Sequence, residues 1–148
     1  MLRTRLFERY VFATVIVGLA FCSLGMGGLG EQDPTKIPEP AQNFSATVVD
    51  QRDIASDITL MSLDGQTYLI GKRGGATVSI PFENIKTIEF YMSGNDVYAA
   101  VAMKGQPQVE LKMEKDRVLY GKLSYGHFAI KVEYIRKITI HGPTTQER

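Results

Sequence analysis

Residues 68–90 read YLIGKRGGATVSIPFENIKTIEF, and residues 118–140 read VLYGKLSYGHFAIKVEYIRKITI. The two stretches align without a gap over 23 columns, and seven of these columns are identical. The identical columns are Leu69/Leu119, Gly71/Gly121, Lys72/Lys122, Ile80/Ile130, Glu83/Glu133, Ile85/Ile135 and Ile88/Ile138. Self-similarity at a fixed spacing indicates a repeated supersecondary unit. We interpret each copy as a β-hairpin followed by a short turn and a further strand.

Apolar and polar residues alternate through most of the chain outside the N-terminal region. In the second copy, for example, Phe128, Ile130 and Val132 fall on one face of a strand. The pair Asp64-Gly65 between two apolar runs predicts a hairpin turn, because both of its positions need a positive φ. No stretch after residue 30 shows the apolar period of a helix. The only helical structure that we expect there is a short turn near 82–85 or 133–135. The expected strands are 44–50, 58–63, 66–72, 76–82, 85–90, 97–103, 108–114, 117–123, 127–132 and 135–140.

These strands predict an all-β fold in which a duplicated antiparallel unit forms a small barrel or sandwich. Either two small barrels stand in tandem, or two half-units share one core. Units this small are marginal without disulfides or metals, which favours the shared core. The expected segments are 1–30 (a hydrophobic helix, either signal peptide or membrane anchor), 31–43 (a proline-rich linker), 44–141 (a β domain with repeats at about 58–90 and 109–140) and 142–148 (a polar tail).

The N-terminus has a basic start followed by 21 uncharged residues from Tyr10 to Gly30. With its glycine-rich end, this pattern is typical of a secretory signal peptide, here with cleavage before Glu31. The run is also long enough to span a bilayer as an uncleaved anchor. A third interpretation is a lipoprotein, because residues 19–22 (LAFC) resemble a bacterial lipobox that would lipidate Cys22, although phenylalanine stands where that motif needs a small residue. All three interpretations predict export of the rest of the chain.

Charge and cysteine content exclude several classes of function. Three of the 17 basic residues and one of the 16 acidic residues lie in residues 1–30, which leaves 14 basic and 15 acidic residues beyond them. Such a near-neutral domain lacks the basic field that binds nucleic acid. The only cysteine of the chain, Cys22, lies before residue 30, so a cysteine-based metal site or thiol nucleophile is not available in the β domain. We expect no metal and no cofactor, and contact with a membrane only through residues 10–30 if these are retained.

Glycine and lysine recur at the same positions of both copies. We interpret Gly71 and Gly121 as sites of a bend or bulge within a strand. Lys72 and Lys122 would then protect sheet edges against aggregation. Pro81 cannot donate a ladder hydrogen bond, so it predicts that its strand lies at an edge or ends there.

The order of strands, glycine turns and a closing Ile-x-x-Ile strand is similar to small SH3-like and Sm-like β-barrels. The first copy carries this likeness in Asp64-Gly65, Gly71, Gly74-Gly75, Ile80-Pro81-Phe82, Ile85 and Ile88, and the second in Gly121, Gly126, Ile130, Ile135 and Ile138. The resemblance covers roughly residues 58–90 and 109–140. It implies a small barrel fold. We do not carry over the RNA binding common in Sm-like proteins, because predicted export and the near-neutral charge contradict it.

Positions that differ between the copies, and exposed aromatic residues, are the places to expect binding specificity. Tyrosine is enriched at protein interfaces. The candidates for partner binding are Arg73, Tyr91, Tyr125, His127 and Tyr134.

The sequence therefore predicts an exported, non-enzymatic β-rich interaction or structural module of the bacterial cell envelope, either periplasmic or at the cell surface. Its partner would be another envelope protein or a second copy of itself. One alternative is a membrane-anchored accessory subunit of an envelope complex, and another is a small envelope enzyme. The enzyme is disfavoured because no motif for a nucleophile and its base, or for a metal, can be assembled from these residues.

Overall fold

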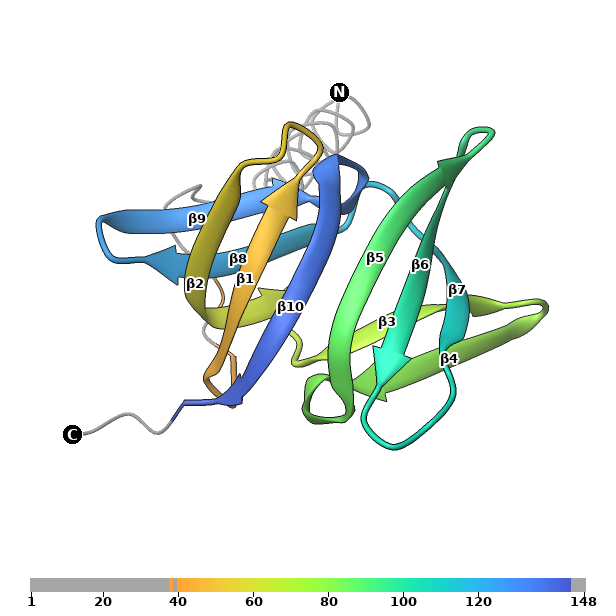
Figure 1. The fold of residues 1–148 in the computed structure, drawn as a ribbon, viewed down its shortest axis with the longest axis horizontal. Coiled ribbons are helices and arrows are strands. Elements are labelled where there is room, and N and C mark those ends of the chain that lie inside the picture. Colours follow the sequence, from red (N-terminus) through yellow and green to blue (C-terminus); the bar gives the residue numbers. More distant parts are fainter. Residues whose placement is uncertain (1–37, 39, 145–148) are drawn as a thin grey trace, which may run out of the picture. The chain divides into compact units, whose positions relative to one another are not determined.

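A computed structural model shows ten antiparallel strands in one sheet (Figure 1). It describes residue 38 and residues 40–144. The strands are β1 (Phe44–Asp50), β2 (Ala55–Leu63), β3 (Tyr68–Arg73), β4 (Ala76–Pro81), β5 (Ile85–Ser93), β6 (Asp96–Met103), β7 (Val109–Met113), β8 (Val118–Leu123), β9 (Gly126–Lys131) and β10 (Ile135–Pro143). Two 3-10 turns, η2 (Phe82–Asn84) and η3 (Val132–Tyr134), precede β5 and β10. The all-β prediction is confirmed for this part of the chain.

The predictions for the hydrophobic N-terminal helix, its cleavage and Cys22 lie outside the described residues. Among the described residues, no helix is long and apolar enough to cross a membrane.

The strands follow the order β4-β3-β7-β6-β5-β10-β1-β2-β8-β9. The centre of this order is the pairing of β5 with β10, where Ile88 faces Ile138. These two residues are 50 positions apart, as are the aligned columns of the two similar stretches. About this pair, β5 corresponds to β10, β6 to β1, β7 to β2, β3 to β8 and β4 to β9. The first strand of the domain therefore stands beside its last strand.

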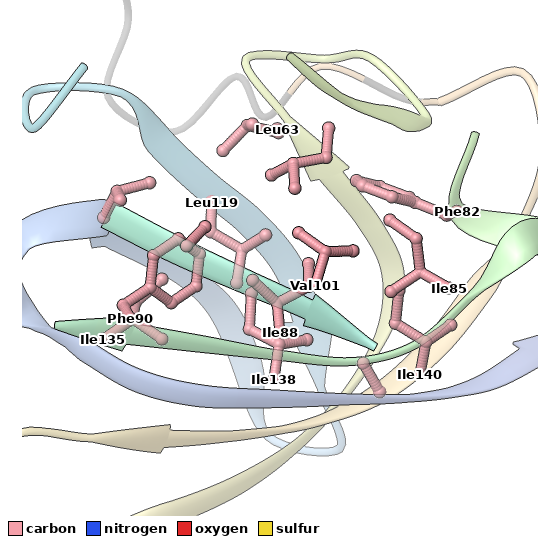
Figure 2. Packing of buried hydrophobic residues seen from close by; sticks show 14 of the residues in the cluster. Leu63, Phe82, Ile85, Ile88, Phe90, Val101, Leu119, Ile135, Ile138 and Ile140 are labelled. Atoms are coloured by element: carbon pink, nitrogen blue, oxygen red, sulfur yellow. The ribbon is translucent and has the colours of Figure 1, made fainter. Parts of the chain in front are cut away.

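The buried side chains form one hydrophobic cluster that draws on both sides of this centre. Figure 2 shows Ile88 and Ile138 in this cluster together with Val101 and Leu119. Ile135, which aligns with Ile85, is fully buried as Ile85 is. Burial explains why isoleucine stands at the two aligned pairs Ile85/Ile135 and Ile88/Ile138, since the hydrophobic effect favours each one removed from water.

The outer strand pairs, β3–β4 and β8–β9, run nearly crosswise to the central strands (Figure 1). At the crossing, a Cβ atom added to Gly71 would lie 2.9 Å from the Leu111 Cβ atom. A Cβ atom added to Gly121 would lie 2.7 Å from the Ile58 Cδ1 atom. A bend or bulge was expected at these glycines, but the ladders of β3–β4 and β8–β9 run through them without a register shift. The register shift next to Gly121 lies in the facing strand β2, between Thr59 and Ser62. Glycine is needed here so that two strands can cross in close contact.

Strand β2 turns a corner at Leu60, which has a φ of 53°. It pairs with β1 as far as Ile58 and with β8 from Thr59 onward, with a register shift before Ser62. The Leu60 N–H donates to the Asn43 side-chain oxygen at 2.8 Å. This hydrogen bond helps to hold a backbone conformation that is costly for a branched residue.

The Asp64-Gly65 turn is confirmed, with φ values of 50° and 82° and reciprocal hydrogen bonds between Leu63 and Gln66. The expected edge position of Pro81 is also confirmed, since β4 ends the sheet. The edge role expected for Lys72 and Lys122 is wrong, because β3 and β8 are each second from the edge.

Three strands extend at least three residues beyond their expected bounds. Strand β10 runs to Pro143, into the segment expected to be a tail, because it pairs with the start of β1. In the other two strands, polar residues join the ladders. Strand β2 begins at Ala55, where three polar or small residues pair with β1 before the apolar run starts. Strand β5 continues to Ser93 because it pairs with β6 throughout, so Tyr91 lies in a strand and not in a turn.

The crossing at Gly121 gives a test of stability. We expect Gly121→Ala to lower the free energy of unfolding by about 1–3 kcal/mol, because the new methyl group would overlap Ile58. Gly126→Ala is the matched control, since its Cβ atom would meet no atom within 4 Å. Urea unfolding of both variants measures the difference. Equal losses would contradict a close crossing at Gly121.

Candidate binding surface

Two tyrosines stack on the solvent side of the central strands. Tyr91 on β5 is paired with Tyr98 on β6, and their rings lie 5.7 Å apart at an interplanar angle of 18°. The Tyr91 hydroxyl donates a hydrogen bond to the Glu110 carboxylate on β7. The Lys112 ammonium, also on β7, donates to the Asp96 carboxylate at 2.7 Å. We call Tyr91, Tyr98, Glu110 and Lys112 the tyrosine face.

Local sequence places these groups on one side. In β7, Leu111 and Met113 are buried, so strand alternation turns Glu110 and Lys112 to solvent. In β6, Val97 and Ala99 are buried in the same way, which turns Tyr98 outward.

The neighbours of Tyr91 and Lys112 shift their protonation equilibria. The hydrogen bond to Glu110 raises the pKa of Tyr91 above its ordinary value, and partial desolvation and the charges of Glu110 and Tyr98 add to this. The hydrogen bond to Asp96 raises the pKa of Lys112, although desolvation opposes it. Near neutral pH, Tyr91 is therefore a neutral donor and Lys112 is a cation.

A groove of about 660 Å³ adjoins the tyrosine face. Its walls come from β7 and from the end of β3 with the following turn. It is lined by Lys72, Arg73, Gly74, Tyr98, Gln108, Val109, Glu110 and Lys112. Three of these side chains are cationic and one is acidic, so the groove has a positive charge in a domain that is otherwise close to neutral.

At the corresponding place in the other half of the strand order, beyond the β5–β10 pairing, different side chains form a series of hydrogen bonds. His141 aligns with Tyr91, and its Nε2 atom lies 2.9 Å from the Thr47 hydroxyl. That hydroxyl donates to the Asp57 carboxylate at 2.6 Å, so the histidine Nε2–H must donate to Thr47. In a nucleophilic triad the histidine stands between hydroxyl and carboxylate. Here the hydroxyl stands between the other two groups, which suits structural bonding.

The five residues predicted to bind a partner lie in three places. Arg73 lines the groove. Tyr91 does not line it, but its ring stacks on Tyr98, which does. Tyr125, 85% exposed, is in the turn between β8 and β9, and His127 is exposed on β9. Tyr134, 55% exposed, lies in η3, where its carbonyl accepts a hydrogen bond from the Gln51 N–H at 2.9 Å. The structure thus brings Arg73 close to the tyrosine face and puts Tyr125 and His127 on one hairpin.

Sequence reasoning missed Lys72, Tyr98, Glu110 and Lys112 as members of one surface. The alternation in β7 does point Glu110 and Lys112 outward, so part of the signal was present. Their grouping depends on the neighbour order β3-β7-β6-β5, which no local pattern reveals. Among the described residues, no group of three or more histidine or acidic side chains could hold a metal ion.

Residues 40–143 match the model of a protein family described as "Uncharacterised protein". The chain belongs to this family. The matched region contains all ten strands, the tyrosine face and the groove. No curated protein and no solved structure matches the chain.

The Tyr91–Glu110 hydrogen bond gives a test by titration. We expect Glu110→Gln to lower the pKa of Tyr91 toward its ordinary value near 10, because the charged acceptor is removed. The stabilisation from the bond is present below that ordinary pKa and is lost as pH rises through the raised pKa. Tyrosinate absorbance, taken as the difference from a Tyr91→Phe background, measures the shift. An unchanged Tyr91 titration in Glu110→Gln would contradict the bond.

Proposed function

We propose that the protein is an exported, non-enzymatic interaction or structural module of the bacterial cell envelope, which binds another envelope protein by adding one of its strands to the sheet. The supporting observation is the presence of two exposed edge strands, β4 and β9, each paired on one side only. An edge strand offers unpaired backbone donors and acceptors to an extended segment of a partner.

The free side of each edge follows from the hairpin register. The Val132 N–H donates to the Arg117 carbonyl, so the even-numbered residues of β9 direct their backbone groups toward β8. His127, Ala129 and Lys131 then direct theirs away from the sheet. By the same register, the Phe82 N–H bonds to the Thr67 carbonyl, and Pro81 occupies an outward position in β4.

The two edges differ at this outward position. Pro81 removes one donor from the β4 edge, whereas Lys131 retains the donor at the corresponding place in β9. Tyr125 and His127 add exposed aromatic rings to the same hairpin. Strand β9 is therefore the better docking edge of the two.

A duplicated unit is the second part of the proposal. It is supported by seven identical columns, by the pairing of Ile88 with Ile138, and by matching glycines at the strand crossings. In this view each unit is a small five-stranded barrel, and β1 and β2 complete the unit that contains β8, β9 and β10.

Export is supported by the basic start and the long uncharged run of residues 10–30. The module would act in the periplasm or at the cell surface. If residues 10–30 are retained, the same β domain would serve as an anchored accessory subunit of an envelope complex.

Docking at the β9 edge is tested by Lys131→Pro. Lys131 has a φ of −71°, which proline adopts without strain, and Pro81 already holds the corresponding position in β4. We expect the variant to keep its melting temperature but to capture much less partner from cross-linked native envelope, because the outward N–H is lost.

Lys131→Gln is the matched control, because it removes the charge and keeps the N–H. It should capture partner as the unchanged protein does. Equal capture by all three proteins would reject the β9 edge as the docking site.

The N-terminus gives a separate test of export. Intact mass of the protein isolated from its native envelope should correspond to a chain that begins at Glu31. A mass that includes Met1 in the membrane fraction would favour the anchored form, and recovery of an uncleaved chain from the cytoplasm would contradict export.

A further inference from the structure

We propose that the groove between β3 and β7 binds an extended acidic segment of a partner protein. This inference rests on the proposed interaction function and names the chemistry of one partner segment. The contact would be made by Lys72, Arg73 and Lys112 with carboxylates of the partner, and by Tyr98 with its apolar or aromatic side chains.

The charges in the groove are incompletely balanced within the described residues. Lys72 and Lys112 are directly paired across β3 and β7, and two like charges in this position destabilise a sheet. Asp96 compensates Lys112, but no described carboxylate forms an ion pair with Lys72 or Arg73. An anion bound between these cations would relieve the repulsion.

The shape of the groove follows from the glycine crossing. Gly71 lets β3 touch β7 at Leu111 and Lys112, and a single residue pair joins the two strands. By comparison, five residue pairs join β6 to β7. The two strands diverge beyond the crossing, so the β3-facing side of β7 is left without a full ladder next to the cations. An extended chain can lie there and reach backbone groups as well as charges.

The tyrosine face favours a peptide over a nucleic acid. Tyr98 lines the groove, and its ring is already stacked on Tyr91, which leaves it as a fixed wall with one free side. Such pre-organised tyrosines are enriched at protein interfaces. A nucleic acid would need a longer row of cations, and the domain beyond residue 30 has more acidic than basic residues.

Strands β8 and β2, in the other half of the strand order, correspond to β3 and β7 and allow a comparison with the groove. Lys122 corresponds to Lys72, but it is paired with Thr59 where Lys72 faces Lys112. Leu123 stands where Arg73 stands. The cation cluster therefore occurs in only one half of the strand order, although both halves contain a glycine crossing. Because the crossing forms without these cations in the other half, the cations are not required for the fold. Their presence in the groove favours a role in binding.

The test uses the full-length protein and a fluorescein-labelled peptide of alternating glutamate and serine, followed by fluorescence anisotropy at low salt. We expect saturable binding that weakens about tenfold in the double variant Lys72→Ala/Arg73→Ala. The control Lys86→Ala/Lys122→Ala carries the same change in net charge at two exposed lysines outside the groove, and its affinity should stay within about twofold. The melting temperature of Lys72→Ala should equal or exceed that of the unchanged protein, because a like-charge pair is removed.

Equal weakening in the two double variants would overturn the proposal, since it would show attraction by net charge alone. Absence of saturable binding, or tighter groove-dependent binding of an oligothymidylate, would also overturn it. The outcome can be separated from that of the proposed function. If Lys72→Ala/Arg73→Ala still captures the envelope partner fully while Lys131→Pro does not, the groove proposal fails and docking at β9 stands.

Discussion

The pairing of Ile88 with Ile138 is the contact on which the domain depends. It joins β5 to β10 and makes two groups of five strands into one sheet with one hydrophobic cluster. Neither group could bury its apolar face as well alone, because a unit of that size leaves much of its surface in water. The two glycine crossings then fold the outer hairpins against the central strands, which covers the remaining apolar surface on each side.

The shared framework and the differing surfaces have separate physical causes. Corresponding positions such as Ile85 and Ile135 are both fully buried in the hydrophobic cluster, so the same apolar residue fits both positions. Exposed positions carry no such constraint. Tyr91 and His141 therefore occupy corresponding places yet form different hydrogen-bonded chains, one to Glu110 and one through Thr47. Corresponding places in the strand order thus present two chemically distinct surfaces.

The sequence predicted the strands and turns well because alternation and turn residues act locally. The Asp64-Gly65 turn and the edge position of Pro81 are examples. The neighbour order could not be predicted in this way, since β1 meets β10 from the far end of the chain. The corner at Leu60 also escaped prediction, because a leucine with positive φ is stabilised by a distant contact with Asn43 and not by its own preference.

The candidate surface shows the same division between local and long-range information. Arg73 was found as a candidate from its place in the two similar stretches, and Tyr91 was found separately as one of the tyrosines. Their relation to Tyr98 and Lys112 arises only when β7 inserts between β3 and β6. Surface chemistry that depends on three strands from different parts of the chain leaves no contiguous motif to read.

The position of β1 between β2 and β10 has a consequence for the order of folding. Phe44, at the start of the domain, pairs with Pro143, at its end. A ribosome or a translocation channel releases β1 first, and this strand has no final partner on one side until the last strand has emerged. Contacts so distant in sequence slow folding and leave apolar strands exposed in the meantime. Folding can therefore finish only after the whole domain has been delivered.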